Sequence, residues 1–139
     1  MSLESHIQDL LANTAAVSAI LGAGNAARIY PGRLPQGCIY PALQIMRVSG
    51  QDQYHLRGPD GKAKARLQLT FYGDTVTSLK DLGTGLIPKT KAALAGYTGS
   101  RKGIRVCSTV HSNTQDMGFD DALKAYRVAM DYLFIEMET

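Results

Sequence analysis

Residues 64–72, Lys-Ala-Arg-Leu-Gln-Leu-Thr-Phe-Tyr, decide the fold because two kinds of side chain alternate strictly along them. One set comprises Ala65, Leu67, Leu69 and Phe71, and the residues between them are polar or amphipathic. Successive side chains of a strand point to opposite faces of a sheet. The period of two therefore predicts a strand with one buried face and one face toward water.

The preceding residues supply the partner of this strand. An extended apolar pattern predicts a strand from Ala42 to about Tyr54, and Gly58-Pro59-Asp60-Gly61 is a strong turn signal. Two strand segments around one turn predict an antiparallel hairpin with a mobile tip. Before it, residues 23–41 are rich in Gly and Pro, which predicts an ordered surface loop with a short strand at Arg28–Tyr30.

Two segments with apolar residues at helical spacing lie outside the hairpin. Residues 2–22 predict one long helix with a possible break at Asn13-Thr14, or two short helices. Residues 75–94 predict a second helix, which Gly83, Gly85 and Pro88 weaken in the middle. We expect a kink or a break in the helical register there.

The C-terminal part predicts two more strands. In the first, Ile104, Val106 and Val110 share a face and alternate with Arg105 and Cys107. A turn is expected at residues 116–121, and residues 123–137 alternate over their whole length, which predicts the longest strand. The order of elements predicts an α+β fold: an antiparallel sheet of about four to five strands, two main helices on one face, and a long β-hairpin arm. We expect residues 1–139 to form a single domain.

Composition excludes several classes of protein. The 139 residues carry a net charge of only +3, and their Lys and Arg residues are scattered rather than gathered in one run. Cys38 and Cys107 are too few and too far apart for a disulfide framework. Neither a signal peptide nor a membrane-spanning segment is recognisable, so we expect a cytoplasmic protein without membrane contact.

No catalytic or metal-binding pattern emerges. His6, His55 and His111 lack the spacing of zinc ligands, and each is predicted to be an ordinary surface or partly buried histidine. Cys107 and His111 could share a strand face, but four residues of strand separate them by about 13 Å. We expect no enzyme activity, no cofactor and no bound metal.

Several short stretches together resemble a known family. They are Val17–Gly22, Arg28–Gly32, Leu34–Gly37, Tyr40–Leu43, Arg47–Gly50, Leu56–Gly61 and Arg66–Leu69. In sequence and order they resemble the small tail-completion proteins (tail terminators, or head–tail joining proteins) of long-tailed bacteriophages and prophages. The resemblance extends over nearly the whole chain and is densest from Arg28 to Leu69.

The resemblance implies a structural protein of the virion. Its subunits would form a ring, expected to be hexameric, at the head-proximal end of the tail tube, after assembly in the host cytoplasm. The ring would stop tube polymerisation and contact the head–tail connector protein on one side and the major tail-tube protein on the other. DNA would pass through its lumen without sequence-specific binding.

On this interpretation the loop and the hairpin make the contacts. The loop residues are Tyr30, Pro31, Leu34 and Pro35, and the hairpin-tip residues are Tyr54, His55, Leu56 and Arg57. The loop could equally fold over the edge of the core. Arg47, Lys64 and Arg66 would face the lumen or pair across a subunit interface; a solvated sheet face is the alternative.

Two other functions remain open. A nucleic-acid-binding module would use six cations: Lys62, Lys64, Arg66, Arg101, Lys102 and Arg105. A small hydrolase would use Cys107 or His111.

Overall fold

The computed structural model describes residues 3–22, 27–35, 37, 39–55 and 58–138, and it describes side chains except those of residues 49–62 and 138. The described helices are α1 (Leu3–Ala12), α2 (Ala15–Leu21), α3 (Val76–Lys80) and α4 (Leu86–Leu94). The described strands are β1 (Ile29–Pro31), β2 (Ala42–His55), β3 (Gly58–Gly73), β4 (Gly99–Arg101), β5 (Ile104–Asp120) and β6 (Ala125–Glu138).

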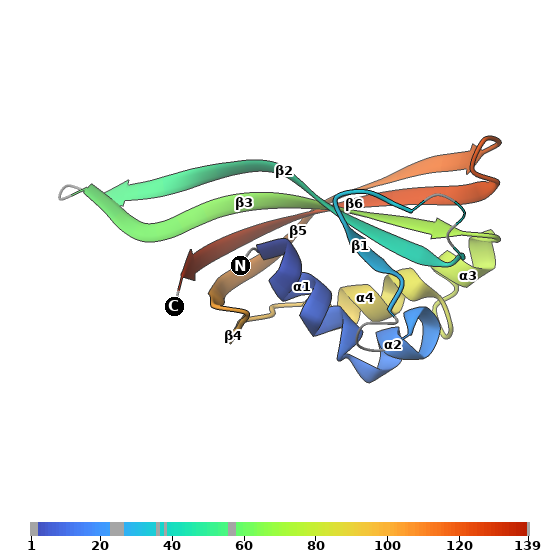
Figure 1. Cartoon of the computed structure of the whole chain (residues 1–139), viewed down its shortest axis with the longest axis horizontal. Helices are drawn as coiled ribbons and strands as arrows, with labels where there is room; N and C mark the ends of the chain where they lie inside the picture. Colours follow the sequence, from blue (N-terminus) through green and yellow to red (C-terminus); the bar gives the residue numbers. More distant parts are fainter. Residues whose placement is uncertain (1–2, 23–26, 36, 38, 56–57, 139) are drawn as a thin grey trace.

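The strands form one sheet in the order β1-β2-β3-β6-β5-β4. All neighbours are antiparallel except β1 and β2, which are parallel. The helices lie on one side of this sheet (Figure 1), and the opposite side, here called the open face, carries no helix among the described residues. The α+β class is confirmed. The short strand β1 corresponds to the one expected at Arg28–Tyr30, and the six described strands exceed the expected four to five because β4 extends the other edge.

The alternation in residues 64–72 is confirmed. Ala65, Leu67, Leu69 and Phe71 are at most 1% exposed and point toward the helices. Their partners on β6 lie beside them in continuous register, and both rows pack against apolar side chains of α1, α2 and α4. Burying each large apolar side chain contributes about 1.5–3 kcal/mol, so this layer stabilises the fold strongly.

Both predicted helices are interrupted. Asn13 and Thr14 donate side-chain hydrogen bonds to the carbonyl oxygens of Asp9 (2.8 Å) and Leu10 (2.7 Å), which compete with continuation of the helix. Of the two alternatives for the first segment, two short helices are therefore correct. The second segment is divided by residues 81–85 into α3 and α4, a larger interruption than the expected kink.

Strand β5 differs most from the expectation. It has 17 residues, and its register with β6 slips at Cys107, Ser112 and Met117. Each slip inserts one extra residue, a β-bulge, and reverses the faces that follow. Consequently Thr109 replaces Val110 on the core side, and Val110 is 53% exposed on the open face. The expected turn at residues 116–121 was also wrong, since β5 continues to Asp120.

The β2–β3 hairpin projects beyond the rest of the molecule (Figure 1). Strand β6 pairs with β3 only from Lys62 onward, and β1 covers only Leu43–Ile45 of β2. Within the described residues, the distal part of the hairpin is therefore two-stranded. This is the expected arm.

Candidate assembly surfaces

The loop of residues 28–41, here called the proline loop, is fixed to the body at its two ends. The Gly32 amide donates to the Ile45 carbonyl at 2.7 Å, which extends the β1–β2 pairing. The Arg28 guanidinium donates to the Pro41 carbonyl at 3.0 Å and to the Ile20 carbonyl at 2.6 Å. One arginine thus ties both ends of the loop to α2.

The predicted contact residues of this loop divide into two groups. Tyr30 and Leu34 are half-buried, whereas Pro31 and Pro35 are exposed. The loop therefore offers a proline surface while part of it packs on the body.

The far end of the loop covers part of the open face. The ring of Tyr40 stacks on that of Tyr72 with centroids 6.3 Å apart, and Tyr72 is only 8% exposed. Ile39, next to Tyr40, is 70% exposed. The loop thus folds over the sheet at Tyr40 and leaves the apolar side chain of Ile39 exposed.

The hairpin residues are placed only in part. The backbones of Tyr54 and His55 belong to β2 and pair with Pro59 and Gly58 of β3. Leu56 and Arg57 lie outside the described residues, as do the side chains of Tyr54 and His55.

Arg47 lies on the helix side of the sheet. Its guanidinium is 3.2 Å from the Glu4 carboxylate of α1 and 3.3 Å from the Glu136 carboxylate of β6. Partial burial disfavours the charge, but Glu136 and Glu4 outweigh this effect and raise the pKa of Arg47. Arg47 therefore connects α1 to the sheet within one chain.

Lys64 and Arg66 lie on the open face. Arg66 pairs with Leu133 of β6, which in turn pairs with Val110 of β5, so apolar side chains lie beside the cation. The Arg66 Nε is buried and has no hydrogen-bond partner among the described residues. A buried donor without a partner is costly, so this face has an unfilled hydrogen-bonding position.

The six cations of the nucleic-acid alternative do not share one surface. Arg105 joins Lys64 and Arg66 on the open face, across Met137 from Lys62, whose side chain is not described. Arg101 instead binds the Asp9 carboxylate of α1 at 2.7 Å, and this hydrogen bond raises the pKa of Arg101.

Cys107 and His111 form no catalytic pair in this arrangement. Cys107 is the extra residue of the first bulge, and the His111 Nε2 contacts the Thr114 hydroxyl at 2.8 Å. The His111 ring lies against Tyr132, whose pKa is raised to about 12 by burial, so that phenol stays protonated at neutral pH. Among the described residues, no group of His, Cys, Asp or Glu is arranged to hold a metal ion. None of the described helices has the length and hydropathy to cross a membrane.

Comparison with known proteins decides the family. The family model for tail completion protein gp17 matches residues 5–135. The chain belongs to this tail-completion family. A search of the curated proteins gives no significant match. Among solved structures, a chain of the virion of a native gene transfer agent particle has the same fold, with a TM-score of 0.59 and 15% identity, covering 98% of this chain and 95% of that one.

As a member of the tail-completion family, the chain has a structural role in phage tail assembly. The sequence interpretation missed one feature of this tail-completion protein, His6. It was expected to be an ordinary surface or partly buried histidine, but it is 0% exposed. Its Nδ1 is 3.0 Å from the Ile104 carbonyl and its Nε2 is 2.8 Å from the Tyr97 hydroxyl. His6 thus holds α1 against the start of β5.

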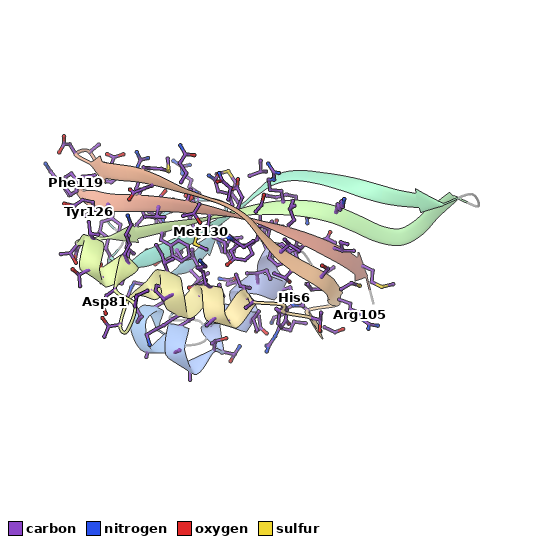
Figure 2. The ribbon with its side chains drawn as sticks, turned by 180° about the vertical axis from the view of Figure 1, so that it is seen from behind. His6, Asp81, Arg105, Phe119, Tyr126 and Met130 are labelled. Atoms are coloured by element: carbon purple, nitrogen blue, oxygen red, sulfur yellow. The ribbon has the colours of Figure 1, made fainter. Side chains whose placement is uncertain are left out.

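A second missed feature is a set of exposed apolar side chains: Val76, Leu82, Met117, Phe119 and Leu123. Figure 2 shows Phe119 of the β5–β6 hairpin and Asp81, the neighbour of Leu82, well apart from each other and both on the side away from Arg105. They come from α3, from the turn after it, and from the β5–β6 hairpin. A salt bridge between Lys80 and Asp116 joins these two parts. In the sequence, an aspartate precedes each of the two turns, and this pattern could have predicted them.

Proposed function

We propose that the protein forms a ring, expected to be hexameric, that caps the head-proximal end of the tail tube and joins it to the head connector. The chain would act as one domain, assemble in the host cytoplasm and remain in the virion. The main support for this proposal is the family match over residues 5–135. The structurally similar chain belongs to the virion of a gene transfer agent particle, which supports a place in the virion for this protein as well.

The edges of the sheet support a ring. Among the described strands, β1 covers only Leu43–Ile45 of β2 at one edge, and β4 covers only Ile104–Val106 of β5 at the other. Long parts of β2 and β5 therefore have backbone groups without a neighbouring strand. Two different surfaces on opposite sides of a subunit allow a head-to-tail contact, which closes into a ring when the rotation permits.

The partners follow from this proposal. Other copies of the chain would contact its sides, and the tail-tube protein and the connector protein its two ends. DNA would pass through the lumen. The proline loop (Tyr30, Pro31, Leu34 and Pro35), the hairpin tip (Tyr54, His55, Leu56 and Arg57) and the cations Lys64 and Arg66 remain the proposed contact residues. Arg47 is instead paired with Glu4 and Glu136 of its own chain.

Assembly state tests this proposal. Sedimentation velocity over a wide concentration range, with negative-stain images, should show oligomers and rings, and tail-tube protein should increase their population. A chain that stays monomeric at every concentration and never associates with tail-tube protein would contradict the proposal.

A nucleic-acid-binding module is the second candidate, because Lys64, Arg66 and Arg105 share the open face. Duplex DNA should then be retarded at low salt, with an affinity that falls steeply as salt rises. The absence of retardation at low salt would eliminate this candidate.

A further inference from the structure

Each edge of the sheet is covered at one end only, and the covered ends are opposite. β1 lies beside β2 only at Leu43–Ile45, and β4 lies beside β5 only at Ile104–Val106. Elsewhere the outer sides of β2, from Met46 onward, and of β5, from Cys107 to Asp120, have no neighbouring strand among the described residues. Each edge therefore forms a step, in which a short strand projects beside a recess.

The register fixes the height of each projection along the strands. Paired residues on successive strands form transverse rows, and the rows through β1 reach β5 at residues 114–116. The rows are Ile29, Leu43, Phe71, Val128 and Asp116; Tyr30, Gln44, Thr70, Ala129 and Gln115; and Pro31, Ile45, Leu69, Met130 and Thr114. The row through Gly99 of β4 reaches β2 at Asp52. Thus β1 projects at a height where β5 is recessed, and β4 projects where β2 is recessed.

The two short strands also run in the same direction. β1 is parallel to β2, and the successive antiparallel pairs across the sheet give β4 the direction of β2 as well. Rotation about an axis along the strands preserves every strand direction. A second copy placed beyond β5 would therefore bring its β1 antiparallel to β5, as β4 already is, and its β2 parallel to β4. Residues 64–68 of β3 separate the heights of β4 and β1, so both strands fit end to end.

The bulges of β5 favour a strand as short as β1. Between the bulges at Ser112 and Met117, residues 113–116 stay in continuous register with β6. The three residues of β1 fall within this stretch when the rows are aligned. A strand of the usual length, about five to six residues, would extend across a bulge. In height, direction and length, the projecting strand of one copy fits the recess of another.

β1 presents backbone groups to a neighbour on its outer side. The Gly32 amide donates to the Ile45 carbonyl of β2 at 2.7 Å. Because the backbone groups of a strand alternate between its two sides, those of Ile29 and Pro31 point away from β2. The Ile29 carbonyl accepts one bond from the Gln8 side chain at 2.9 Å and retains a second lone pair. Pro31 has no amide hydrogen, so β1 offers the Ile29 amide and two carbonyl groups.

We propose that β1 of one subunit pairs with residues 114–116 of β5 in the next, so that β1 and β4 share one strand position between two sheets. This inference rests on the proposed ring and specifies how its subunits join through a head-to-tail contact. The occupant is a second copy, because a single contact between two copies fills the recess on each side. A strand of another virion protein in the same recess is an outcome of the test.

A disulfide between subunits tests the joint. Tyr30 and Gln115 would lie directly opposite each other, as a non-hydrogen-bonded pair with Cα atoms about 4.5 Å apart, which a disulfide spans. Within one chain they lie on β1 and β5, four strand spacings or about 19 Å apart along the sheet. We expect Tyr30→Cys with Gln115→Cys, in a chain with Cys38→Ser and Cys107→Ser, to form a ladder of disulfide-linked oligomers under mild oxidation.

The matched control moves one cysteine along the same strand. Ser108 pairs with Ile135 in the row of Lys64, six residues of β3 from the row of Gln115, which is about 20 Å. Tyr30→Cys with Ser108→Cys should therefore give few linked oligomers. Equal linkage by the two pairs, or rings in which neither pair links, would overturn the inference and leave the proposed function intact. So would linkage of Gln115→Cys to tail-tube or connector protein instead of a second copy.

Hydrogen exchange on the natural protein gives an answer that does not depend on the cysteine variants. When oligomers form with rising concentration, exchange in a peptide spanning residues 113–117 should slow by about tenfold or more. A peptide spanning the turn at residues 121–124 should be unaffected. Oligomers without protection of residues 113–117 would contradict the joint alone. If no oligomer forms at any concentration, with or without tail-tube protein, both the inference and the proposed function fail.

Discussion

The Nε2 of His6 lies 2.8 Å from the hydroxyl oxygen of Tyr97, with the two rings at 70°. Because the Ile104 carbonyl can only accept, His6 Nδ1 carries the proton and Nε2 accepts from Tyr97. Tyr97 also supplies its backbone carbonyl to the Thr109 hydroxyl at 2.8 Å. These three hydrogen bonds join α1, the segment after α4, and β5.

Removing the Tyr97 hydroxyl should weaken the fold. Tyr97→Phe leaves the buried His6 Nε2 without its partner, which should cost about 1–3 kcal/mol in the free energy of unfolding. Urea denaturation at pH 7.5 measures this cost. Tyr126→Phe is the matched control, because Tyr126 contacts Phe119 through its ring and should change stability little. Equal stability of the two variants would contradict the hydrogen bond from the Tyr97 hydroxyl to His6 Nε2.

The same contact should make stability depend on pH. Burial lowers the pKa of His6 below 6.5 in the folded protein, so the unfolded chain binds this proton at higher pH. The contribution of neutral His6 to the free energy of unfolding is therefore complete above pH 6.5. It is lost as the pH falls from 6.5 toward the pKa of His6 in the folded protein.

Denaturation at several pH values from 8 to 5 isolates this effect if the natural protein is compared with His6→Asn. Asp9 and Arg101, the charged groups that influence His6, remain in both proteins. The natural protein should lose more stability toward acid than the variant does. If the free energy of unfolding of both proteins fell equally with pH, His6 would not be the source of the pH dependence.

Two glycines only two positions apart should respond differently to alanine. A Cβ at Gly85 would lie 2.5 Å from the Asp81 carbonyl oxygen, so the turn between α3 and α4 must distort. A Cβ at Gly83 would lie 3.6 Å from the Asp81 carboxylate, which is an ordinary contact. We expect Gly85→Ala to cost about 1–3 kcal/mol and Gly83→Ala to be close to neutral in thermal unfolding.

The two arginines on opposite faces should also differ. Arg47→Met removes ion pairs with Glu4 and Glu136, which are partly exposed, so the cost should be at most about 1 kcal/mol and should shrink with salt. Arg66→Met removes a buried Nε that has no partner among the described residues, so it should be neutral or stabilising in the isolated protein. A larger loss of stability for Arg66→Met would contradict this description.

The sequence predicted those features that depend on local periodicity. The strict alternation around Leu67 and Leu69 assigned the core face of β3 correctly, because a regular strand never loses its period of two. The alternation in residues 104–110 placed Val110 on the wrong face, because the bulge at Cys107 reverses the faces and no residue type marks that bulge. Strand β4 has only three residues and forms by pairing with β5, so no local pattern could reveal it.

The elements that carry the candidate surfaces were predictable only in part. The proline loop and the arm are visible in the sequence because Pro and Gly mark them. The turn at Leu82 was interpreted as a weakened helix, although Asp81 with Gly83 and Thr84 is a recognisable turn pattern. Ion pairs such as Arg47 with Glu136 join residues far apart in the chain, so local patterns could not predict them.

The three bulges of β5 also limit what can polymerise on this strand. Between them, no stretch in continuous register with β6 exceeds four residues. A long, regular strand with a free edge is a template for uncontrolled aggregation into fibrils. A strand that slips every five residues offers only short segments to a foreign strand, which disfavours such growth along its exposed edge.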